Sequence, residues 1–113
     1  MFELHNITKD SKFNLISRKF GGGSFDEINV DVPDPNNGLN TIFIKRMEGF
    51  SLFDWAALMA AATNIYMVAS SNIYLLEMME LRAQEIHLYP RLPRETDHRN
   101  YQYILQRHRY TLH

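Results

Sequence analysis

Two serines and an asparagine stand between an apolar run with strand-like composition and a segment with helical spacing. They are Ser70, Ser71 and Asn72. Side chains of these types cap helices, and the free backbone amides at a helix start, together with the positive end of its dipole, attract anions. This turn could therefore bind a phosphate or a diphosphate. An ordinary helix cap explains the same residues equally well, and both interpretations stay open.

A second candidate anion site follows an earlier strand-like run. Arg18 and Lys19 precede the sequence Gly-Gly-Gly-Ser at positions 21–24. Two cations beside a loop whose backbone amides can approach a ligand closely would suit a diphosphate. The chain has no G-x-G-x-x-G motif and no P-loop motif, so a solvated connection with a flexible tip is the stronger interpretation here.

A third candidate lies before the first clear helical segment. Gly49 and Ser51 could border a ligand, but Ser51 and Asp54 also form the S-x-x-D pattern that starts a helix. A plain helix cap is the simpler explanation of this turn.

Metal and nucleophile chemistry find little support in the residue pattern. The chain has no cysteine and no G-x-S-x-G motif, which removes thiol nucleophiles and the hydrolase elbow. Its five histidines form no i, i+4 pair with a carboxylate ligand nearby. We therefore expect no metal and no cofactor, and the pattern identifies no catalytic residue.

Length and charge exclude several classes of protein. The chain has 113 residues, with 12 basic against 13 acidic side chains. This size fits one domain, and the near-neutral charge gives no reason to expect a nucleic-acid partner. The longest apolar stretch, Trp55 to Ala62, is far below the roughly 20 residues that cross a bilayer. With no signal peptide at the N-terminus, we expect a cytoplasmic protein without a membrane span.

The elements that would position these candidates alternate along the chain. Apolar and β-branched runs predict strands over 12–17, 41–44, 65–69 and 86–89, the run at 41–44 being buried on both faces. Alternation from Asp26 predicts a half-exposed edge strand that breaks at Pro33. Three-four spacing predicts helices over 52–62, from residue 72 onward, and near residue 96. The second helix would bury Ile73, Leu76, Met78 and Met79. The order β, β, β, α, β, α, β, α predicts one α/β domain over 1–113, a Rossmann-like three-layer fold with a mostly parallel sheet.

Nearly half of the chain resembles a known family. The motifs are G-F-S-L-F-D-W at 49–55, A-T-N-I-Y-M-V at 62–68 and the serine pair before the next helix. From Asn40 to Arg91, the sequence is similar to the C-terminal half of two-domain GT-B glycosyltransferases.

The resemblance implies that the chain binds a nucleotide-diphosphate sugar in a cleft between two Rossmann-like domains. It implies that Ser70 and Ser71 contact the diphosphate, that Arg18 or Lys19 neutralises it, and that residues 49–51 border the nucleotide. A complete enzyme of this family also needs an acceptor-side domain of comparable length. We therefore expect a donor-binding half that is completed by a partner and does not catalyse transfer alone.

An alternative function starts from a departure from the family pattern. Ala69 stands where the family usually has aspartate before the serine pair. A noncatalytic α/β domain that associates with itself or with another protein would tolerate this change. A third possibility is a regulatory module that binds a small phosphate at the same turn. The sequence does not determine the sugar, the acceptor or the oligomeric state.

Overall fold

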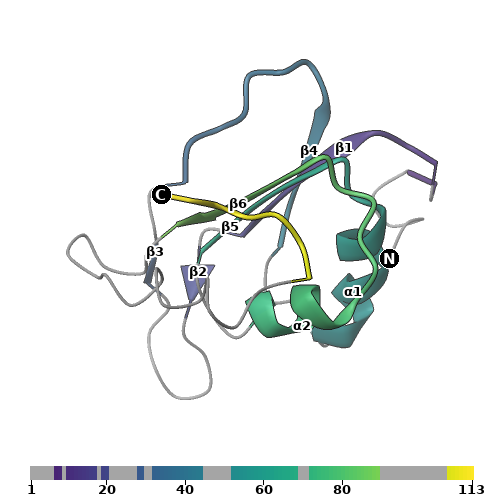
Figure 1. Ribbon diagram of the computed structural model, residues 1–113. Helices are drawn as coiled ribbons and strands as arrows, with labels where there is room; N and C mark the ends of the chain where they lie inside the picture. Colours follow the sequence, from purple (N-terminus) through teal and green to yellow (C-terminus); the bar gives the residue numbers. More distant parts are fainter. Residues whose placement is uncertain are drawn as a thin grey trace.

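The chain folds around one five-stranded sheet, shown in Figure 1. The computed structural model describes residues 7–8, 10–17, 19–20, 28–29, 32–44, 52–68, 72–89 and 107–113. Side chains are described within these ranges except at 19–20, 28–29, 52–54 and 72–74.

All neighbouring strands of the sheet run parallel. The strands are β1 (Phe13–Ser17), β4 (Asn40–Phe43), β5 (Asn64–Val68), β6 (Glu85–Tyr89) and β7 (Thr111–Leu112). Their order across the sheet is β4-β1-β5-β6-β7. Two short strands, β2 (Lys19–Phe20) and β3 (Ile28–Asn29), pair with each other in the antiparallel direction. A parallel sheet with helices confirms the predicted α/β, Rossmann-like class.

Two helices lie on one side of this sheet (Figure 1). They are α1 (Leu52–Ala61), rich in the strong helix formers alanine, leucine and methionine, and the shorter α2 (Asn72–Met78). Their apolar side chains and one face of the sheet form the main core, whose buried members are Phe13, Leu15, Ile42, Trp55, Leu58, Met59, Ala61, Ala62, Ile65, Met67, Leu76, Ile86 and Leu88. No helix in the described part of the chain is long and apolar enough to cross a membrane.

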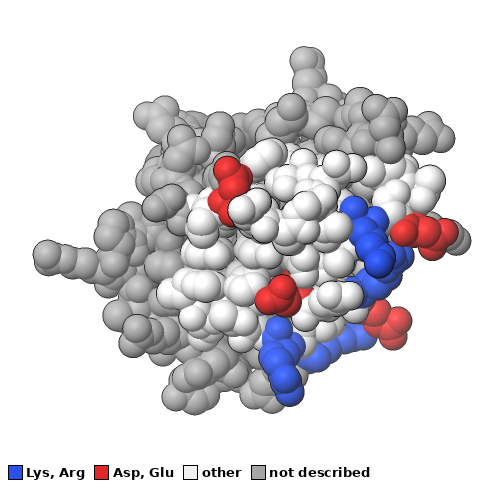
Figure 2. Space-filling view, turned by 90° about the horizontal axis from the view of Figure 1, so that it is seen from above, with Lys and Arg blue, Asp and Glu red and all other residues white. Residues whose placement is uncertain are grey.

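The opposite face of the sheet carries a smaller core and a polar network. Buried Ile16, Val32 and Tyr89 pack together there with half-buried Tyr66. Figure 2 looks at the molecule from above, and the described residues at the centre of this view are mostly uncharged. Lys and Arg side chains gather toward one side of the view, interleaved with Asp and Glu.

The polar network ties the amino ends of β1 and β5 to a turn. The fully buried Asn14 exchanges two amide hydrogen bonds with Asn37, each 2.9 Å long, and accepts a third from the Asn64 amide at 3.1 Å. Asn37 Oδ1 also accepts the backbone N–H of Leu39. Gly38 has φ +78°, a conformation that glycine adopts without strain, which confirms the turn predicted at Asn37-Gly38.

Thr63 joins the end of α1 to the sheet. Its hydroxyl accepts a hydrogen bond from the backbone N–H of Phe13, and its own N–H donates to Phe13 O at 2.9 Å. Its carbonyl accepts the N–H of Gln84 at 2.7 Å. Thr63 thus bridges the chain segments that begin β1 and β6, which fixes the start of β5 between them.

Several predicted details are wrong. β4 is an edge strand, so Phe43 is 42% exposed and the run is not covered on both faces. The helix α2 ends at Met78, which is 74% exposed instead of buried. β7 was not predicted at all. The helix predicted near residue 96 lies outside the described residues.

Candidate functional site

The direction of chain progress across the sheet reverses between β1 and β5. From β1 the chain goes to β4 on one side, whereas β5, β6 and β7 follow one another on the other side. In parallel α/β sheets, connections that leave two adjacent strands in opposite directions open a crevice beyond their carboxyl ends. This reversal is where a ligand is expected from topology alone.

Strand registers bring three carboxyl ends together at this edge. Ser17, the last residue of β1, is level with Met67 of β5. On the other side, the N–H of Ile44 donates to Ile16 O at 2.7 Å, just beyond β4. The segments that follow β4, β1 and β5 therefore leave the sheet from adjacent positions.

The seven predicted site residues belong to these three segments. Arg18 follows β1 directly, and the backbone of Lys19 pairs with Asn29 in the small antiparallel sheet. Gly49 and Ser51 lie in the connection from β4 to α1, whereas Ser70 and Ser71 connect β5 to α2, of which Asn72 is the first residue. Arg18, Gly49, Ser51, Ser70 and Ser71 lie outside the described residues, as do the side chains of Lys19 and Asn72.

The described strand ends at this edge carry no ionised side chain. These end residues are Ser17, Phe43, Val68 and Tyr89. Burial, with a smaller contribution from Tyr66, raises the pKa of the Tyr89 phenol, which stays neutral at physiological pH. Any positive charge offered to an anion at these strand ends must therefore come from the segments that follow them.

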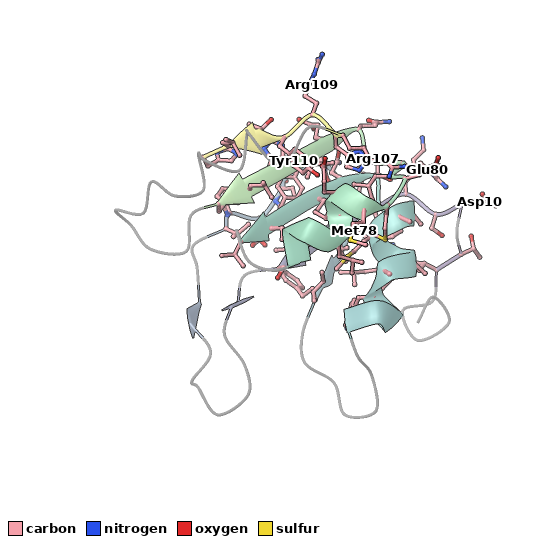
Figure 3. The ribbon with its side chains drawn as sticks, turned by 60° about the horizontal axis from the view of Figure 1, so that its bottom comes forward. Asp10, Met78, Glu80, Arg107, Arg109 and Tyr110 are labelled. Atoms are coloured by element: carbon pink, nitrogen blue, oxygen red, sulfur yellow. The ribbon has the colours of Figure 1, made fainter. Side chains whose placement is uncertain are left out.

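The helix α2 is held at its C-terminal end by residues 107–110. Glu77 accepts the backbone N–H of Arg107 and the hydroxyl of Tyr110, the latter at 2.8 Å. The His108 ring places Nε2 2.9 Å from Leu76 O and 2.8 Å from Met79 O, so it satisfies carbonyls that end the helix. Figure 3 shows Arg107 and Tyr110 beside the end of α2, with Arg109 pointing away. This clamp fixes the helix whose other end begins at Asn72.

The clamp predicts a dependence of stability on alkaline pH. Burial, followed by the hydrogen bond to Glu77 and the charge of Glu77, raises the pKa of Tyr110 far above its usual range. Because the folded protein holds this proton more tightly than the unfolded chain, the free energy of unfolding should fall as pH rises above about 10. Tyr110→Phe should lower the free energy of unfolding at pH 7 by about 1 kcal/mol.

The measurement is urea unfolding of both proteins from pH 7 to pH 11. The difference between them should shrink above pH 10, because the variant lacks the phenol that must ionise. Tyr66 and Tyr89 also have raised pKa values, mainly from burial, so both proteins retain a common alkaline decline that cancels in the difference. A constant difference across the whole range would contradict the assignment.

Two groups of side chains were missed by sequence reasoning. One is the network of Asn14, Asn37 and Asn64; the other is a contact between His87 and His113 across β6 and β7. The turn at Asn37-Gly38 was the only available signal for the first. The second depends on a strand pairing that no local pattern reveals.

Comparison with protein-family models, with curated proteins and with solved structures finds no match for this chain. The features that bear on function are therefore the sheet topology and the residues that follow its strands.

Proposed function

We propose that this chain binds the diphosphate of a nucleotide-diphosphate sugar, as the donor-binding half of a glycosyltransferase that needs an acceptor-side partner for catalysis. The observation that supports it most is the reversal of strand order between β1 and β5. The basic pair Arg18 and Lys19 follows one of these strands, and Ser70 and Ser71 follow the other.

The segments that follow β1 and β5 supply different groups that a diphosphate needs. The turn after β5 offers hydroxyl donors before a helix, and the turn after β1 offers two cations. A diphosphate presents several acceptor oxygens and negative charges, and the described strand ends contribute none of the charge that would balance them. Gly49 and Ser51 follow β4, on the other side of β1, where they would border the nucleoside.

Binding is tested by calorimetric titration of the folded chain with UDP, GDP and ADP and with their glucose conjugates. We expect saturable binding of at least one nucleotide, and tighter binding of the diphosphates than of the matching monophosphates. No heat at millimolar ligand, with folding verified by circular dichroism, would overturn the proposal.

The serine pair provides the matched variant. Ser70→Ala combined with Ser71→Ala should weaken nucleotide binding by about 1 to 2 kcal/mol, since hydrogen bonds to a charged group are lost. The control is Ser11→Ala, a described serine in the segment before the amino end of β1 that bonds Thr8. Equal affinity of the double variant and the parent chain would remove the serine pair from the site.

Inorganic phosphate separates the proposal from a simpler anion site. If phosphate competes as strongly as the nucleotide, the turn binds only a small anion and the nucleoside contributes nothing to the affinity. Under the proposal, phosphate competes at least tenfold more weakly, because the segment with Gly49 and Ser51 adds contacts to the nucleoside.

A further inference from the structure

Two imidazoles converge on the face of the sheet opposite the helices. His87 Nδ1 lies 2.9 Å from His113 Nε2, across the pairing of β6 with β7. One of these nitrogens donates a proton and the other accepts it, so at least one lone pair already faces the partner ring. The backbone N–H of His113 donates to Leu88 O at 3.0 Å, which anchors His113 beside β6.

An aromatic neighbour stacks on each of the two rings. Tyr66 stacks on His87 with ring centroids 4.8 Å apart, and Tyr89 stacks on His113 with centroids 4.3 Å apart. The interplanar angles of these two stacks are 1° and 4°. The His87 side chain is only 16% exposed, whereas His113 is exposed, so one ring is held firmly and the other can adjust.

The spacing of the two nitrogens suits adjacent ligands of one metal ion. Nitrogens that each lie about 2.0–2.1 Å from an ion are about 2.9 Å apart at a right angle and about 3.3 Å apart at the tetrahedral angle. The observed 2.9 Å is the length of a hydrogen bond in which the two nitrogens point at each other, so the rings must turn before both can bind an ion; an ion bound at this short spacing would hold them near the right angle that Cu²⁺ and Ni²⁺ prefer. A small outward movement of the exposed ring would aim both lone pairs at an ion between them.

A carboxylate stands at the far side of the buried ring. Glu85 Oε1 lies 3.5 Å from His87 Nε2, the nitrogen that does not face His113. Histidines that bind metals almost always give their second N–H to a carboxylate, a carbonyl or water, which fixes the tautomer and raises the basicity of the ligand nitrogen. Glu85 is placed to hold that proton on Nε2, which leaves the lone pair of Nδ1 facing His113.

We propose that His87 Nδ1 and His113 Nε2 bind one divalent late transition-metal ion, Cu²⁺ or Ni²⁺ in preference to Zn²⁺, with Glu85 as the positioning residue behind His87. The described residues hold no cluster of three or more His, Asp or Glu side chains suited to a metal, so these two imidazoles are the ligands that the described part of the chain supplies. The ion would tie β7 to β6 at the edge of the sheet.

The site is located by adding substoichiometric Cu²⁺ to the ¹⁵N-labelled chain at pH 7.5 and recording amide spectra. Paramagnetic broadening should be strongest for residues 85–89 and 111–113. Calorimetry with Ni²⁺ then gives the affinity.

Three variants test the assignment of ligands. His113→Ala removes an exposed ligand without opening the core and should weaken Ni²⁺ binding at least tenfold. Glu85→Gln should weaken it about tenfold while keeping the broadening pattern, as expected for a positioning residue. His108→Gln is the matched control with unchanged affinity, because the Nε2 atom of His108 already faces two carbonyls.

The outcomes divide cleanly. Broadening centred on β6 and β7 that disappears in His113→Ala supports the site. Broadening centred elsewhere, or the same Ni²⁺ affinity in His113→Ala as in His108→Gln, overturns it. A preference for Zn²⁺ over Ni²⁺ would overturn the tetragonal geometry.

Discussion

Asn14→Leu is expected to lower the free energy of unfolding by about 2 kcal/mol, although it puts an apolar side chain of similar size into a buried position. The reason is the loss of three short hydrogen bonds around a side chain that water does not reach. Asn37 lies at the surface and can turn to water. Asn64 is 5% exposed and cannot do so, which leaves its amide unpaired inside the protein.

The effect is amplified because Asn64 is already only partly satisfied. Among the described residues, no group donates a hydrogen bond to Asn64 Oδ1. Removing Asn14 would leave both polar atoms of the Asn64 side chain without a partner. An unsatisfied buried group costs about 1 to 3 kcal/mol, more than the net gain from a typical hydrogen bond.

A double-mutant cycle measures this coupling. Asn64→Leu alone also destabilises, but Asn14→Leu combined with Asn64→Leu should be more stable than the sum of the single changes by about 1 kcal/mol or more, since no polar group is then left buried. Urea unfolding of the four proteins provides the numbers. Strict additivity would show that the two amides do not act together.

Leu76→Ala should cost about 3 kcal/mol, the usual result of emptying a fully buried leucine site. Leu76 belongs to the main core and is the fully buried residue among the described side chains of α2, at positions 75–78. The helix has seven residues, too few to be stable without packing against the sheet. Loss of the Leu76 side chain should therefore destabilise the whole helix. We therefore also expect weaker nucleotide binding, because α2 begins at Asn72.

Met78→Ala is the control on the same helix. Met78 is 74% exposed, and alanine is the better helix former, so the free energy of unfolding should change by less than about 0.5 kcal/mol. Thermal and urea unfolding of both variants make the comparison. A large loss in Met78→Ala would mean that a surface covers this side chain in solution.

The sequence predicted the central strands of the sheet better than its edge strand β7 and the end of α2. β1, β5 and β6 lie at the centre of the sheet, where continuous apolar and β-branched runs are required, and the helix at 52–62 shows clear three-four spacing. β7 consists of Thr111 and Leu112 and exists only through its pairing with β6. Met78 continued the apolar spacing of α2, but the helix ends there and the side chain points to solvent.

The candidate site was predictable as separate segments but not as one place. The sequence identifies Arg18 and Ser70 as residues that follow strands, yet these two residues are 52 positions apart along the chain. Only the strand order shows that β1 and β5 are neighbours. The same reason hid the contact between His87 and His113, since each histidine alone looks like an ordinary surface or core residue.

The central place of β1 has a consequence for the newly made chain. Its two partners come later in the sequence, and Phe13 is linked to Thr63, 50 positions further on. At about 5–20 residues per second, a ribosome needs roughly 3–10 s to make that stretch. During this time Phe13, Leu15 and Ile16, all fully buried in the finished protein, lack the partner strand β5. One edge of this apolar strand therefore stays open to other chains until β5 emerges.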